Sequence, residues 1–198
     1  MASLVYYNKY IYNFSILLSY GRHYSDRMKK INSLIPENSS VLDICCGPCN
    51  IYYALKNKNI RYFGLDYNQN FVNKARQEGI RAEVFDIYKD SFPNENFDCI
   101  IMQGSLYQFY ENRFEIIEKM LEATSQFVIV SEPIKNLVDR IPAPLATVIK
   151  KLKDPGTGAT PHSFTEKSFD ETMNHFKKHV LATYDIGEGI EKLYLLKK

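Results

Sequence analysis

The sequence predicts an α/β fold built on a mostly parallel sheet, because short apolar segments alternate with helical stretches from residue 40 to residue 132. Near the end of the chain only Gly187-Glu188-Gly189 separates two further strand-like segments, which predicts an antiparallel hairpin at one side of the sheet. The 198 residues, 45% of them hydrophobic, are enough for one packed domain, which we expect to span residues 1–198.

The individual elements follow from apolar spacing. Residues 3–35 are predicted to form two helices, divided at Gly21 and stopped by Pro36. The predicted strands are residues 41–45, 61–66, 82–86, 97–103, 126–132, 180–186 and 190–196. Further helices are expected at residues 51–56, 71–79, 114–121 and 169–176. Several prolines follow residue 132, so residues 134–160 are predicted to form a helix interrupted by loop.

The bulk properties argue against several classes of protein. A net charge of +2 and a pI near 8.2 do not favour a nucleic-acid binder. The apolar run at residues 16–18 is too short to span a bilayer, and no signal peptide is recognisable. Four cysteines, three of them within residues 45–49, do not resemble an extracellular disulfide framework. We therefore expect a cytoplasmic protein without a membrane partner.

The segment C-G-P-C, Cys46 to Cys49, has the spacing of a thioredoxin dithiol. Such chemistry requires a thiolate of low pKa at a helix N-terminus. The chain contains no Trp, whereas thioredoxins carry one just before the first cysteine. Two predicted strands after this segment end in Asp66 and Asp86, and a thioredoxin fold gives no reason for these acids. A thiol–disulfide oxidoreductase stays open as an alternative function.

Read more widely, the segment V-L-D-I-C-C-G-P-C resembles motif I of the class I S-adenosylmethionine (SAM)-dependent methyltransferases. Asp43 falls on the acid of that motif and Gly47 on its middle glycine. Cys45 and Cys49 occupy the positions of the first and third glycines. Glycine there permits unusual backbone angles and close approach to the cofactor, so the two cysteines are a departure from the family pattern.

The resemblance continues downstream. Y-F-G-L-D-Y-N ends in an acid, Asp66, that matches the residue binding the ribose hydroxyls, and A-E-V-F-D-I ends near Asp86, which matches the residue binding the adenine amino group. The resemblance implies a three-layer Rossmann-like sandwich with a seven-stranded sheet, and SAM as the cofactor. It implies cofactor contacts from Asp43, Cys45, Cys46, Gly47, Pro48, Cys49, Asp66, Tyr67, Asn68, Asp86, Ile87, Met102, Gln103 and Gly104.

A nicotinamide-binding Rossmann domain is the nearest alternative fold. Its loop would need several glycines to approach a pyrophosphate, and often a basic partner. Residues 41–55 contain one glycine and no Lys or Arg. A loop flanked by acids suits a sulfonium cation without phosphate, which favours SAM.

The resemblance also divides the chain into a helical lid (1–36), a SAM-binding core (37–133) and a substrate-side segment with the terminal hairpin (134–198). Aromatic residues of the lid would then either pack between its helices or form the wall of a pocket over the cofactor. His162 is the candidate general base, needed only if the acceptor must lose a proton. The candidate acceptor-facing residues are Tyr20, His23, Tyr24 and Tyr107.

The predicted activity is methyl transfer to oxygen or nitrogen of a small-molecule acceptor. The near-neutral charge supports this, as does the absence of the N/D-P-P-Y/F segment of enzymes that methylate adenine, cytosine or glutamine amides. We expect a monomer or homodimer that binds no nucleic acid. No metal is expected, because no second Cys/His pair accompanies the clustered cysteines. The two missing glycines leave a SAM-binding protein without activity as a further alternative.

Overall fold

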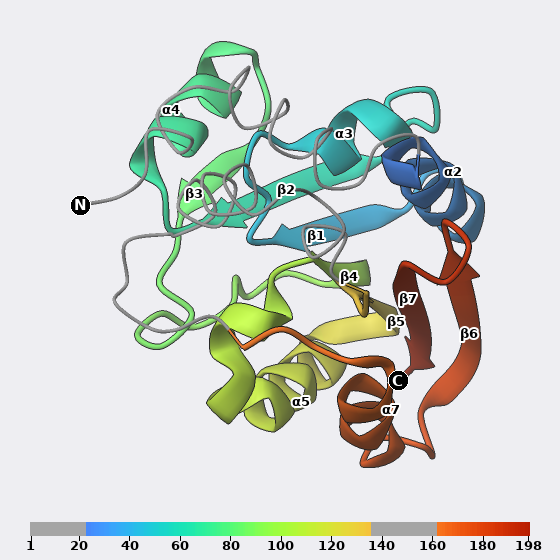
Figure 1. Ribbon diagram of the computed structural model, residues 1–198. Coiled ribbons are helices and arrows are strands. Elements are labelled where there is room, and N and C mark those ends of the chain that lie inside the picture. Colours follow the sequence, from blue (N-terminus) through green and yellow to red (C-terminus); the bar gives the residue numbers. More distant parts are fainter. Residues whose placement is uncertain (1–22, 136–161) are drawn as a thin grey trace, which may run out of the picture.

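The computed structural model describes residues 23–135 and 162–198, which form one seven-stranded sheet with the order β3-β2-β1-β4-β5-β7-β6 (Figure 1). β1 to β5 run parallel, and β7 is antiparallel to both of its neighbours, β5 and β6. The predicted parallel sheet with an antiparallel hairpin is therefore confirmed. The strands are β1 (Ser40–Ile44), β2 (Arg61–Asp66), β3 (Ala82–Val84), β4 (Phe97–Gln103), β5 (Thr124–Pro133), β6 (Val180–Ile186) and β7 (Glu191–Lys197).

Helices cover both faces of this sheet, which makes the three layers that the sequence predicts (Figure 1). They are α2 (His23–Leu34), α3 (Asn50–Leu55), α4 (Gln69–Gln77), α5 (Arg113–Ala123) and α7 (Glu166–Asn174), with a 3-10 helix, η2 (Leu106–Asn112). In Figure 1, α2, α3 and α4 lie on one face, and α5 and α7 on the other. The first helix predicted in residues 3–35 and nearly all of the interrupted helix predicted after Pro133 fall outside the described residues. Of the helices described, none has the length and apolarity needed to cross a bilayer.

Two apolar layers hold the helices to the sheet. Because neighbouring strand residues point to opposite faces, each central strand contributes to both layers. Leu42 and Ile44 of β1 pack with Ile117 of α5, whereas Val41 packs on the other face with Ile31 of α2. All of these side chains are almost fully buried. Burial on both faces explains why the strands appear in the sequence as continuous apolar runs rather than alternating ones.

The strand order creates the place for a site. The chain leaves β1 towards β2 on one side, and β4 pairs with the other side of β1. In open parallel sheets, ligands bind outside the carboxyl ends of the strands at such a reversal of order. The carboxyl ends of β1, β2, β4 and β5 therefore form the edge at which functional side chains are expected.

Candidate functional site

The loop after β1 has the backbone that a glycine motif would give. Cys45, Gly47 and Cys49 have φ angles of 58°, 53° and 58°. This left-handed region is disfavoured for residues with a Cβ atom. The three residues stand at the three glycine positions of the motif, so the cysteines adopt the glycine-like conformation despite its steric cost. The substitution changes the side chains of the loop and preserves its path.

Asp66 joins this loop to the end of β2. The Gly47 N–H donates to Oδ2 of Asp66 at 2.7 Å, and the Asn68 N–H donates to Oδ1 at 2.8 Å. Burial raises the pKa of Asp66, and these two amides oppose the shift. A carboxylate offers about four lone-pair sites. Asp66 therefore retains capacity to accept further hydrogen bonds from a ligand with hydroxyl groups.

Asp43 lies beneath the loop and is only 2% exposed. Its Oδ2 accepts a hydrogen bond from the Tyr62 hydroxyl at 2.6 Å. Burial raises the pKa of Asp43 to about 7, although the hydrogen bond from Tyr62 favours the charged form. Asp43 thus links β1 to β2 just before the loop. Tyr62 was not recognised from the sequence, because an aromatic residue in a β-strand is common for packing reasons alone.

The C-G-P-C cysteines are buried thiols. The Sγ atoms of Cys46 and Cys49 are 3.8 Å apart, and the chain turns between them through a hydrogen bond from Cys49 N–H to the Cys46 carbonyl. All four cysteines are free. The hydrogen bond with Cys49 and burial raise the pKa of Cys46 well above its ordinary value. A dithiol oxidoreductase requires the opposite shift, so the geometry does not favour that alternative.

The segment after β4 faces the same edge. Gly104 has a φ of 58°, and its N–H donates to the carbonyl of Ser131 on β5 at 2.7 Å. Gln103 ends β4 and is part-exposed, whereas the side chain of Met102 is fully buried in the layer that packs on α5. The structure thus leaves Gln103 and Gly104 at the edge and allows Met102 to contribute through its backbone only.

A turn after β3 completes the edge. The Phe85 N–H donates to the Asp66 carbonyl, which carries the chain past the end of β2. Asp86 accepts from the Tyr88 N–H at 3.0 Å and pairs with Lys89 at 2.7 Å, and this pairing lowers its pKa. β3 ends at Val84, two residues earlier than predicted, because the Asp86 side chain organises this turn.

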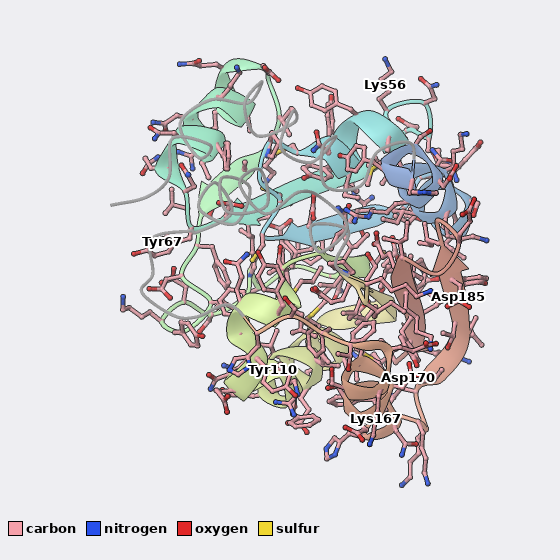
Figure 2. All side chains as sticks on the ribbon, viewed as in Figure 1. Lys56, Tyr67, Tyr110, Lys167, Asp170 and Asp185 are labelled. Carbon is pink, nitrogen blue, oxygen red and sulfur yellow. The ribbon has the colours of Figure 1, made fainter. Side chains whose placement is uncertain are left out.

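The side chains of this turn and of the connection between β2 and α4 differ in exposure. Ile87 is buried, whereas the Tyr67 and Tyr88 rings are 71% and 60% exposed. Figure 2 shows Tyr67 projecting away from the body of the molecule, at the left of the view. Asn68 has a local role in addition: its side chain accepts hydrogen bonds from the first N–H groups of α4. The loops after β2 and β3 therefore each present one exposed aromatic ring, Tyr67 beside Asp66 and Tyr88 beside Asp86.

The residues predicted to face the acceptor do not form one cluster in the described structure. His162 is exposed, stacks on Tyr110 with ring centroids 4.8 Å apart, and lies 3.8 Å from Glu111, both residues of η2. His23 packs against the Gly187 turn of the terminal hairpin. Tyr24 lies against the Arg27 guanidinium. Tyr107 belongs to η2, and Tyr20 lies outside the described residues.

Sequence reasoning did not single out a buried polar network at the other end of the edge. Arg27 of α2, 1% exposed, forms an ion pair with Glu191 of β7. Glu191 also accepts a hydrogen bond from the Ser131 hydroxyl at 2.6 Å. An Arg27 guanidinium nitrogen lies 4.0 Å from the point where a side chain on Gly104 would begin. The sequence held one signal of this burial: Arg27 lies one turn before Ile31, on the buried face of α2.

A separate hollow of about 990 Å³ lies along α7, β6 and β7. Two of its acids are neutralised by Lys192, which binds Asp170 at 2.8 Å and Glu166 at 3.0 Å. Figure 2 shows Asp170 and Lys167 at the lower right, far from Tyr67. This hollow contains none of the predicted cofactor residues, so we place the candidate site at the carboxyl edge of β1, β2, β4 and β5.

Solved structures share this fold. Magnesium protoporphyrin IX methyltransferase from Synechocystis PCC 6803, with bound SAH, is 15% identical with a TM-score of 0.61, over 88% of this chain and 84% of that one. A TehB-like SAM-dependent methyltransferase from Corynebacterium glutamicum is 15% identical with a TM-score of 0.60, over 87% and 88%. A chain of the Haloferax volcanii complex of a methyltransferase with its activator Trm112 is 14% identical with a TM-score of 0.67, over 89% of each.

At these identities the likeness concerns the fold, and it confirms the Rossmann-like methyltransferase architecture predicted from the sequence. No curated protein matches the chain. One family model does match, over residues 25–137, which is more than half of the chain and runs from α2 to just beyond β5. Its description is methionine biosynthesis protein MetW, and the chain belongs to this family.

Proposed function

We propose that the protein is a SAM-dependent methyltransferase that transfers a methyl group to oxygen or nitrogen of a small-molecule acceptor. The observation that carries the proposal is the hydrogen bond between Gly47 and Asp66, which links the motif I loop to the predicted ribose-binding acid at one sheet edge. The Synechocystis enzyme with this fold has been crystallised with SAM and with SAH, which supports the same cofactor here.

We assign described residues to each part of the cofactor. The ribose hydroxyls would donate to Asp66, and the adenine would lie near Asp86 and Ile87, beside the exposed rings of Tyr67 and Tyr88. The methionine end would rest on the 43–49 loop and on the turn at Gln103 and Gly104. The glycine-like backbone of both segments leaves room for close approach of a ligand.

When bound, SAM supplies the reactive methyl group. Its transfer is an in-line displacement, so the chain's main contributions are to align the acceptor with the cofactor and to exclude water. A general base is needed only for an acceptor that must lose a proton, and His162 remains a candidate on sequence grounds alone. The family description, methionine biosynthesis, and the near-neutral charge of the chain support a small acceptor.

Calorimetric titration with SAM and SAH tests the proposal. Asp66→Ala removes the acceptor of two ribose hydrogen bonds, and because hydrogen bonds to charged groups contribute about 1.5–3 kcal/mol each, SAM affinity should fall at least about 100-fold. Asp185→Ala is the matched control, because this exposed residue lies on β6, the outermost strand on the side of the sheet away from β2 (Figure 2). Wild-type protein that binds neither ligand would refute the proposal.

Turnover requires a second measurement, namely SAH formation against a panel of hydroxyl and amine acceptors. SAH release that depends on an acceptor and is lost in Asp66→Ala would establish the enzyme. Tight SAM binding without turnover on any acceptor would favour the inactive SAM-binding alternative.

A further inference from the structure

Glu132, at the carboxyl end of β5, is a fully buried acid with half of its carboxyl group satisfied. It is 0% exposed, and its Oε1 accepts a hydrogen bond from the Leu106 N–H at 2.6 Å. Within residues 23–135 and 162–198, no group hydrogen-bonds to its other oxygen, Oε2. Buried polar atoms are rarely left without a partner, because each such atom costs about 1–3 kcal/mol. A bound ligand that donates a hydrogen bond to Oε2 would explain why this oxygen has no partner among the described residues.

The neighbours of Glu132 belong to the candidate site. Burial raises the pKa of the Cys45 thiol, and the charges of Asp66, Asp43 and Glu132 raise it further. Cys45 stands at the first glycine position of the motif I loop. Leu106, the hydrogen-bond donor, follows Gly104 by two residues. Glu132 thus lies where the loops after β1 and β4 meet, on the side that would hold the methionine end of the cofactor.

The charges around Glu132 suit a cation. Burial raises the pKa of Glu132 to about 8. The charge of Glu191 adds to this rise, and the hydrogen bond from the Leu106 N–H opposes it. The Ser105 N–H and the charge of Arg27 also oppose the rise, but Arg27 is engaged in its ion pair with Glu191. Near neutral pH the unliganded protein therefore keeps a proton on Glu132. A ligand cation beside Oε2 would displace that proton and form a charge-assisted hydrogen bond in a water-poor site.

We propose that Glu132 binds the α-ammonium group of the methionine moiety of SAM and SAH through Oε2. This inference rests on the proposed function and extends the cofactor site to β5, from which the sequence predicted no cofactor residue. The Leu106 N–H positions the carboxyl group, and Oε2 accepts the ammonium hydrogens. Glu132 is a binding residue in this arrangement and takes no part in the transfer step.

A purely structural role is the competing explanation, because Glu132 also secures the turn before η2. Glu132→Gln separates the two roles. The amide oxygen can still accept from the Leu106 N–H, but the side chain can no longer become a carboxylate. A structural role predicts the same change in affinity for every ligand of the site, whereas our proposal predicts a change only for ligands that carry the amino-acid end.

The experiment compares SAH with 5′-methylthioadenosine, which shares the adenosine and sulfur but lacks the amino-acid end. Glu132→Gln should lower the affinity for SAH by about tenfold or more, which is the loss expected for one charge-assisted hydrogen bond. The affinity for methylthioadenosine should not change. Glu122→Gln, an exposed position on α5, is the control. Equal losses for both ligands, or no loss for either, would overturn the proposal. A wild-type protein that binds neither ligand would instead refute the cofactor assignment itself.

A second measurement uses the wild-type protein and guards against a variant that fails to fold. Calorimetry at pH 7 in buffers of different ionisation enthalpy measures the protons exchanged on binding. Binding of SAH should release a proton from Glu132. Binding of methylthioadenosine should not, because that ligand brings no cation to Oε2. Identical proton exchange for the two ligands would overturn the proposal.

Discussion

The Gly47 N–H donates a hydrogen bond to Oδ2 of Asp66, with 2.7 Å between nitrogen and oxygen. This contact joins the loop after β1 to the end of β2. The other oxygen of Asp66 accepts from the Asn68 N–H, at the residue that caps α4. One carboxylate therefore fixes the motif loop and the start of a helix. The loop is in place before a cofactor binds, which reduces the ordering cost of binding.

Asp66→Ala should therefore destabilise the fold as well as weaken SAM binding. Two backbone N–H groups lose their acceptor, and the free energy of unfolding should fall by about 1–3 kcal/mol. Asp66→Asn retains one acceptor oxygen and should lie between wild type and Asp66→Ala. Urea unfolding without ligand measures the series. Equal stability of the Asn and Ala variants would contradict the view that each oxygen of Asp66 holds one backbone N–H group.

The sequence predicted the fold well because its signals are local. Continuous apolar runs mark strands buried on both faces, and an acid at a strand end, as at Asp66, marks the carboxyl edge. Glu132 also ends its strand, so the same pattern was available there. Its importance depends on a missing partner for Oε2, however, which only the packed structure reveals. The pairing of Arg27 with Glu191 joins positions 164 residues apart, and no local pattern announces such a contact.

The buried ion pair between Arg27 and Glu191 should be costly to break on one side. Arg27→Met leaves the Glu191 carboxylate buried without its cation, and the free energy of unfolding should fall by about 3–5 kcal/mol. In Arg27→Met/Glu191→Gln the remaining side chain is neutral and can still accept from Ser131. We expect the double variant to be more stable than Arg27→Met in urea unfolding. A double variant with the summed loss of both single variants would show that the two charges are not coupled.

Asp43 should make stability depend on pH in the direction opposite to that of an ordinary carboxylate. Burial raises its pKa from 3.8 to about 7 in the folded protein. The folded state therefore holds a proton that the unfolded chain has released, and the free energy of unfolding falls as pH rises from about 4 to about 7. Glu132 acts in the same direction, up to about pH 8.

Asp43→Asn should flatten this dependence in part, leaving the share contributed by Glu132 and Asp66. Chemical unfolding at several pH values measures the slope. Asp98→Asn is an informative contrast, because hydrogen bonds from Ser40 lower the pKa of Asp98. That group contributes stability at neutral pH which is lost as the pH falls, so its removal should change the acidic side of the profile. An unchanged slope in Asp43→Asn would contradict the protonated state of Asp43.

The C-G-P-C thiols should react slowly in the folded protein. Cys46 and Cys49 are 7% and 0% exposed, and burial contributes to the raised pKa of Cys46. Little Cys46 thiolate is therefore present at pH 7, and thiolate is the reactive form. Reaction with an aromatic disulfide reagent should be much faster in urea than in buffer, and insulin reduction should be absent. A rapid reaction of the folded protein that is lost in Cys46→Ser would revive the oxidoreductase alternative.

Cys45→Gly should stabilise the protein even though it removes a side chain. Cys45 is part-exposed at a φ of 58°, so glycine relieves about 1–2 kcal/mol of steric cost while losing little packing. The added freedom of glycine in the unfolded chain costs about 0.5–1 kcal/mol, which leaves a net gain below about 1.5 kcal/mol. Cys49→Gly relieves the same conformation but vacates a fully buried position, so its gain should be smaller or reversed. Urea unfolding of the two variants tests this difference.

SAM affinity should change little in Cys45→Gly, because the loop already follows the path that glycines would give it. A large gain in affinity would mean that the thiol itself obstructs the cofactor.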